Sequence, residues 1–76
     1  MPYSIETCII DMMESMGPQE ESALKRECKT QATDYSEVGF YAALAKLASA
    51  EMIKAEVVGE DTNPCVYYDF PDSYYL

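Results

Sequence analysis

The stretch that decides the fold is Gly39-Phe40-Tyr41-Ala42-Ala43-Leu44-Ala45-Lys46-Leu47-Ala48-Ser49-Ala50-Glu51-Met52-Ile53. Its first part is dense in alanine, the best helix former, and its apolar residues recur at helical spacing. Ahead of it, Asp34 and Glu37 form a near capping box, in which Asp34 is the expected N-cap. The pattern therefore predicts a helix from about Tyr35 to about Ala50. From Ile53 onward, apolar and polar residues alternate, which is typical of a strand.

Two earlier segments also have the periodicity of helices. From Ser4 to Met16, apolar residues follow steps of three and one, which predicts an amphipathic helix with Ser4 as its N-cap. Gly17 and Pro18 end it, since glycine accepts a left-handed cap and proline cannot continue the ladder. Pro18 also suits the first turn of a second helix, whose end we expect between Thr30 and Thr33.

The chain beyond the third helix predicts a β-hairpin. Turn-forming residues fill 59–64, and a second strand from Cys65 to Phe70 has Val66, Tyr68 and Phe70 on one face. We therefore expect an α+β fold of three helices closed by a two-stranded antiparallel hairpin. Residues 1–76 form one small domain, with 71–76 as a C-terminal tail that leaves the sheet at Pro71. The predicted core consists of Ile5, Ile9, Met12, Leu24, Tyr41, Leu44, Leu47, Ile53, Val57, Val66 and Tyr68.

The third helix and hairpin resemble the recognition helix and wing of PadR- and MarR-like winged helix-turn-helix regulators. The resemblance is carried by Tyr41, Leu44, Leu47, Met52 and Ile53, and Val66-Tyr67-Tyr68 resembles the aromatic return strand of the wing. It implies a winged-helix scaffold. One departure is Glu51, where those families usually have glycine. Because glutamate adopts a positive φ less readily than glycine, we expect this turn to be built differently.

Charge is the larger departure from a DNA-binding winged helix. The chain has 14 acidic and 5 basic residues and a formal net charge of −9. The third helix offers only Lys46, the wing turn offers Glu60 and Asp61, and the one basic cluster is Lys25, Arg26 and Lys29. Phosphate contacts need cations, so we expect no appreciable binding to duplex DNA. The resemblance therefore implies a winged-helix scaffold for this chain, but it does not imply DNA binding.

Residue types needed for catalysis or metal binding are scarce. The chain has no histidine, no nucleophile motif and no glycine-rich phosphate loop, so we expect no enzyme, no cofactor and no catalytic residue. Cys8, Cys28 and Cys65 are an odd number without CxxC spacing, and we interpret them as partly buried apolar side chains, not as disulfides or metal ligands. The acids of 59–63 do not match a calcium loop.

Acids and tyrosines together suggest a surface for a protein partner, because tyrosine offers large contact area at low entropic cost. The nominated partner-binding residues are Asp34, Glu37, Glu60, Asp61, Asp69 and Asp72 for charge, with Tyr35, Tyr74 and Tyr75 as anchors. On a partner with a basic nucleic-acid-binding surface, carboxylates could stand in for phosphates as a DNA mimic. In size and charge the chain resembles small phage-encoded inhibitors of the anti-CRISPR and anti-restriction type.

We therefore predict a non-enzymatic acidic protein-binding module, a phage or mobile-element inhibitor that occupies the basic nucleic-acid-binding surface of a partner protein. Two alternatives stay open: a winged-helix DNA-binding transcriptional regulator, and a winged-helix adaptor subunit of a larger complex. No apolar run approaches the ~20 residues of a membrane span and no signal peptide begins the chain, so we expect a cytoplasmic location, in a bacterial host cell if the protein is phage-encoded. The spacing of Met12, Met13 and Met16 fits either the core or the face of a homodimer.

Overall fold

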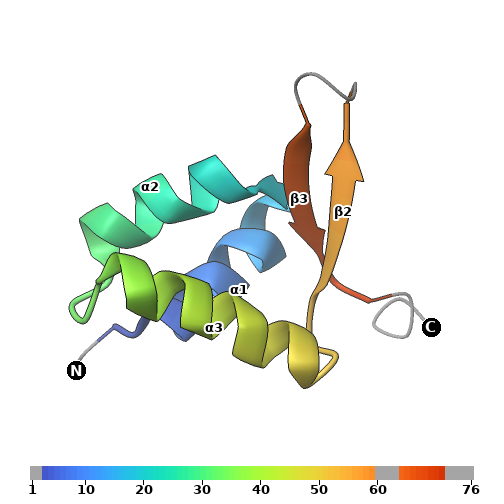
Figure 1. Ribbon diagram of the computed structural model, residues 1–76. Helices are drawn as coiled ribbons and strands as arrows, with labels where there is room; N and C mark the ends of the chain where they lie inside the picture. The colour runs from blue at the N-terminus through green and yellow to red at the C-terminus, as the bar shows by residue number, and fades with distance from the viewer. Residues whose placement is uncertain (1–2, 60–63, 72–76) are drawn as a thin grey trace.

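Three helices and a small antiparallel sheet form the part of the chain that the computed structural model describes, residues 3–59 and 64–71 (Figure 1). The elements follow the order α1 (Ile5–Met16), β1 (Gln19–Glu20), α2 (Glu21–Gln31), α3 (Glu37–Ser49), β2 (Lys54–Val58) and β3 (Cys65–Asp69). Figure 1 shows α1 behind α3, α2 beside them, and the hairpin of β2 and β3 at one end of the helices. The predicted α+β class, with three helices and a hairpin, is confirmed.

Local capping chemistry sets the helix ends. The Ser4 side chain accepts a hydrogen bond from the Thr7 N–H at 3.2 Å, as predicted, and Gly17 ends α1 with a φ of 81°. The prediction for α3 was wrong by two residues. Its N-cap is Ser36, whose hydroxyl accepts from the Gly39 N–H at 2.9 Å. Asp34 instead accepts from the Ile5 N–H at 3.1 Å, so its carboxylate serves α1 and not α3.

The sheet has three strands in the order β1-β3-β2, not the two strands predicted. Gln19 pairs with Tyr68 and Glu20 with Tyr67, while β2 runs antiparallel to β3 from the pair Lys54–Asp69 to the pair Val58–Cys65. Pairing with β3 holds residues 19–20 extended, and α2 therefore begins at Glu21 and not at Pro18. Nothing in the local sequence indicates this pairing, because its partner lies 47 to 49 residues away.

One hydrophobic core fills the space between the three helices and the hairpin. Eight predicted core residues are buried: Ile5, Ile9, Met12, Leu24, Leu44, Leu47, Ile53 and Tyr68. Phe40, at 0% exposure, is the largest fully buried side chain among the described residues, and it is absent from the predicted core. The inward stripe of α3 is Phe40, Ala43, Leu44 and Leu47, the spacing expected of one helix face.

Three predicted core residues lie elsewhere. Tyr41 is 43% exposed, because Phe40 occupies the inward position and the next residue of a helix points about a quarter turn away. Val57 is 71% exposed and Val66 only half-buried, although they pair in the sheet on the same face as buried Tyr68. The hairpin extends beyond the helices at this level, so its inner face is not covered there (Figure 1).

The turn after α3 uses a left-handed residue despite lacking glycine. Glu51 has a φ of 60°, the conformation that glycine favours and that costs other L-residues about 1–2 kcal/mol. The Glu51 N–H donates to the Ala48 carbonyl and the Met52 N–H to the Leu47 carbonyl, which close the helix end. The expectation that this turn is built differently is therefore wrong: the backbone takes the glycine-like geometry, and these hydrogen bonds and the burial of Ile53 offset its strain.

We predict that Glu51→Gly stabilises the protein. Glycine removes the left-handed strain but adds entropy to the unfolded chain, so the net gain should be about 0.5–1 kcal/mol in the free energy of unfolding. Denaturant unfolding followed by circular dichroism measures it. The matched control is Ala50→Gly at an ordinary φ of −81°, which should lower stability by a similar amount. A loss of stability in Glu51→Gly would contradict the assignment of strain to this residue.

Candidate nucleic-acid interface

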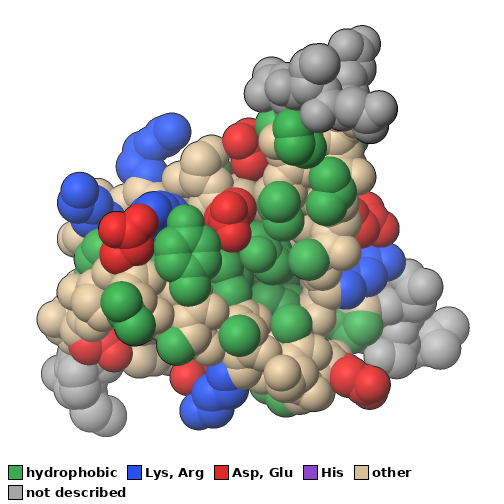
Figure 2. Space-filling view, in the orientation of Figure 1, with side chains coloured by type: hydrophobic (Ala, Val, Ile, Leu, Met, Phe, Trp, Pro, Cys, Tyr) green, Lys and Arg blue, Asp and Glu red, His purple; other side chains and the backbone are tan. Residues whose placement is uncertain are grey.

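The outward face of α3 is apolar and uncharged along most of its length. Val38 is 82% exposed, and Tyr41, Ala42 and Ala45 also face solvent. The side chains that most often read bases in the major groove, arginine, lysine, asparagine and glutamine, do not occur among them. Figure 2 shows apolar side chains gathered between α3 and the hairpin, with the basic side chains of this view mainly around the edges. Contacts from this face would therefore be apolar.

The basic cluster lies on α2 beside this face. Lys25, Arg26 and Lys29, together with Tyr35 and Glu37, line a shallow hollow of about 410 Å³. Lysines and arginines at one hollow are an anion-binding arrangement, unlike the rest of this acidic chain. The hollow is thus the part of the described surface best suited to a phosphate or carboxylate.

Lys25 connects α2 to the start of α3. Its Nζ donates to Glu37 Oε1 at 2.7 Å and to the Tyr41 hydroxyl at 3.3 Å, and it lies 5.1 Å from the centroid of the Tyr41 ring. These hydrogen bonds raise the pKa of the Lys25 ammonium above its ordinary range. The hydrogen bond from Lys25, together with its charge, lowers the pKa of the Glu37 carboxyl. One of the three cations is therefore partly neutralised, and Arg26 and Lys29 are in no ion pair within the described residues.

The hairpin is attached to α2 through Tyr68. Its hydroxyl donates to Glu21 Oε1 at 3.1 Å, and burial together with the nearby Glu21 charge raises the pKa of Tyr68 to about 12. The contact holds β3 against the first turn of α2. The hairpin consequently lies beside α2, at one end of the helices (Figure 1).

The nominated partner-binding residues do not form one patch. Asp34, Tyr35 and Glu37 lie in or next to the turn between α2 and α3, where Tyr35 is half-buried against the core and its ring centroid is 6.5 Å from that of Phe40. Asp69 is at the end of β3, where it accepts from the Phe70 N–H at 2.7 Å. Figure 1 places the turn and the hairpin at opposite ends of the molecule. The remaining nominated residues, Glu60, Asp61, Asp72, Tyr74 and Tyr75, lie outside the described residues.

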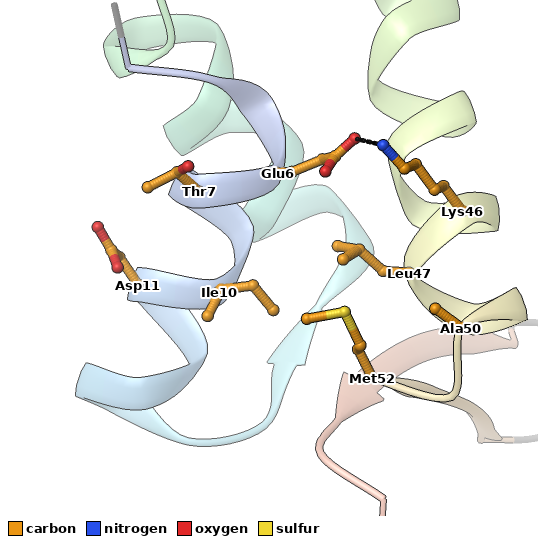
Figure 3. A pocket seen from close by; sticks show the side chains of 8 residues that line it. All are labelled: Glu6, Thr7, Ile10, Asp11, Lys46, Leu47, Ala50 and Met52. Carbon is orange, nitrogen blue, oxygen red and sulfur yellow. Dashed lines mark ion pairs between the residues drawn. The ribbon is translucent and has the colours of Figure 1, made fainter. Parts of the chain in front are cut away.

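A second hollow separates the first helix from the end of the third (Figure 3). It has a volume of about 300 Å³, an apolar base of Ile10, Leu47 and Met52, and the ion pair of Lys46 with Glu6 at 3.2 Å on one side. Lys46, the one cation on α3, is thus turned toward α1 and away from the outward face. Sequence reasoning could not find this pairing, because 40 residues separate the partners.

No obvious metal centre or membrane segment occurs in the described part of the chain. Among residues 3–59 and 64–71, no three His, Cys, Asp or Glu side chains gather as a metal-binding group. Within the same ranges, no helix combines the length and apolar character that crossing a membrane requires.

The fold matches that of a known regulator. A solved structure of a PadR family transcription regulator from hypervirulent Clostridium difficile R20291 aligns with 96% of this chain and 76% of that chain, with a TM-score of 0.75 and 17% sequence identity. No protein-family model and no curated protein matches the sequence. The chain therefore has a winged-helix fold, in which α2 and α3 form the helix-turn-helix and β2 and β3 form the wing.

We predict that Lys25→Met raises the pKa of the Glu37 carboxyl toward its ordinary value. A carboxyl with a lowered folded-state pKa adds stability above its unfolded pKa, about 4.3 for glutamate, and loses it as the pH falls through the folded value. Carboxyl chemical shifts in an NMR pH titration measure the change. Lys46→Met is the control and should leave Glu37 unchanged. If the Glu37 carboxyl titrates at the same pH in wild type and in Lys25→Met, the Lys25–Glu37 ion pair does not form in solution.

Proposed function

We propose that the protein is a winged-helix regulatory protein that binds DNA and has no catalytic activity. The observation that supports this best is the match of almost the whole chain to the fold of a PadR family transcription regulator. In helix-turn-helix proteins the first helix of the motif crosses the DNA backbone and the second enters the major groove. By analogy α2 would face phosphates and α3 would face bases, and the protein would act in the cytoplasm.

The chemistry of α2 supports this arrangement. Lys25, Arg26 and Lys29 share one hollow at the junction of α2 and α3, where a phosphate would pass. On α3, Val38 and the exposed alanines could contact thymine methyl groups but could not form bidentate hydrogen bonds with bases. Binding of this kind takes most of its affinity from phosphate contacts and little from base identity. A homodimer would double the number of cations.

We predict weak, salt-sensitive binding to duplex DNA that depends on the α2 cations. With at most three phosphate contacts per chain, the slope of log K against log salt for a monomer should not exceed about −2.7, a loss of about 40-fold between 50 and 200 mM salt. Fluorescence anisotropy of a labelled duplex measures it. Arg26→Gln with Lys29→Gln should reduce the slope to about −0.9, whereas Lys46→Gln, on the side of α3 that faces α1, should leave it unchanged.

Absence of binding at 50 mM salt would overturn the DNA-binding proposal. Binding that does not respond to the α2 substitutions would contradict the assignment of α2 as the phosphate-facing element. The experiment also separates the two candidate functions, because the second one requires no affinity for duplex DNA.

The second candidate is a protein-binding module, and the composition of the α3 face favours it. A helix whose outward residues are Val38, Tyr41, Ala42 and Ala45 offers apolar contact and one aromatic anchor, which suit a protein surface. The net charge of −9 favours a basic partner, such as a protein that handles nucleic acid. An adaptor subunit or a phage inhibitor of the anti-CRISPR or anti-restriction type would act in this way, in a bacterial cell if phage-encoded.

For this candidate we predict that acidic residues control the rate of association with the partner and that tyrosines control the rate of dissociation. With a partner captured from the host and immobilised for surface plasmon resonance, Glu60→Lys with Asp61→Lys should slow association and weaken its salt dependence. Tyr41→Ala should mainly speed dissociation, by about 10-fold or more, as should truncation of Tyr74 and Tyr75. Thr30→Ala, on exposed α2 surface, is the control. Binding that is insensitive to salt and to all these substitutions would contradict the hypothesis that carboxylates of this chain stand in for DNA phosphates.

A further inference from the structure

The strand β2 lies at one edge of the sheet. In the strand order β1-β3-β2, β2 pairs with β3 along one side, and no other described strand lies along its second side. Figure 1 shows that this second side points away from α2. An edge strand offers a row of backbone N–H and C=O groups for pairing with another strand, and β2 contains no proline that would prevent it.

The two faces of β2 differ in their side chains. Ala55 and Val57 lie on the face toward the core, and Lys54, Glu56 and Val58 lie on the opposite face. Val57 and Val58 are 71% and 51% exposed, so apolar surface remains on both faces. Lys54 and Glu56 have opposite charges two positions apart, and their side chains form an ion pair at 3.6 Å. The strand therefore combines exposed valines with charges that can complement a second copy of the same strand.

We propose that two copies of this chain pair antiparallel along β2, in the register that sets Ala55 of one copy opposite Ala55 of the other. Lys54 of each copy then lies opposite Glu56 of the other, and the dimer contains two such pairs. Opposite charges placed directly across neighbouring strands stabilise their pairing, whereas like charges oppose it. The lysine ammonium has three donors, so its ion pair within the chain does not exclude the one across the interface. The inference does not depend on which macromolecule the protein binds.

Two-fold symmetry leaves few registers for this pairing. When the second strand continues the same face of the sheet, one residue of β2 lies opposite its own copy. If that residue were Glu56, two carboxylates would face each other, which is destabilising. If it were Val57, Glu56 would lie opposite Val58, and Lys54 would have no partner within β2. The register centred on Ala55 is therefore the one that gives both charged residues a partner of opposite charge.

The same register covers apolar side chains that are exposed in the single chain. Val57 would lie opposite Ile53 of the second copy, which is 2% exposed and belongs to the core. Val58 would lie opposite Met52, which is 49% exposed. The end of each hairpin that extends beyond its own helices would thus lie next to the covered end of the other hairpin. The interface would be small, below about 1,200 Å², so we expect a weak and reversible dimer.

The test is sedimentation equilibrium of the full chain at concentrations up to about 1 mM. At about 0.15 M salt, the repulsion between two chains of net charge −9 is largely screened beyond about 8 Å. Wild type should form a dimer, and Lys54→Glu and Glu56→Lys should each weaken it by about 10-fold or more, because two attractive pairs become repulsive. An equimolar mixture of these two variants should associate about as well as wild type, since every cross-strand pair again joins opposite charges.

Further variants separate the interface from folding and from general charge. Circular dichroism shows whether each variant is folded, which matters for Lys54→Glu because Lys54 also pairs with Asp69 in the hairpin. Glu56→Lys lowers the net negative charge, so a change in general repulsion would strengthen association and not weaken it. Glu56→Gln should weaken the dimer less than Glu56→Lys does. Val38→Glu, on the 82% exposed position of α3, is the control and should leave the dimer intact.

Three results would overturn the proposal. A wild-type chain that stays monomeric up to about 1 mM would leave the edge of β2 to an extended segment of another protein. Self-association that Glu56→Lys leaves unchanged, or that Val38→Glu abolishes, would place the interface elsewhere. Failure of the two folded charge variants to associate when mixed would exclude the register centred on Ala55.

Discussion

The structure depends on the hydrogen bonds that join the start of the chain to the turn between α2 and α3. The Asp34 carboxylate accepts from the Ile5 N–H, and the Thr33 N–H donates to the Tyr3 carbonyl at 2.9 Å. These bonds lay α1 across both helices of the helix-turn-helix. They also bring Ile5 close to Gly39, where an added Cβ would lie 2.7 Å from the Ser36 hydroxyl and 3.3 Å from Ile5. Only glycine fits there without a shift.

The close approach of α1 determines which residues α3 presents to a partner. Phe40 turns inward, and Tyr41 consequently points out and meets Lys25. Lys46 turns toward Glu6 on α1. The outward face of α3 thereby carries no cation, and the positive charge available near it comes from α2. Any contact with DNA phosphates would therefore depend on the cations of α2, and any contact with a protein would depend on the apolar face of α3.

Local chemistry in the sequence determined the helices, their order and the hairpin. Ser4 and Gly17 end α1, and the change of period near Ile53 marks the start of the wing, because caps and periodicity involve residues only a few positions apart. Only the tertiary structure decided the pairing of β1 with β3, the inward place of Phe40 and the Lys25–Glu37 ion pair. The strand pairing and the ion pair join residues a dozen or more positions apart, and the inward position of Phe40 depends on how α3 packs against α1. These features follow from tertiary packing, which a short sequence pattern does not specify.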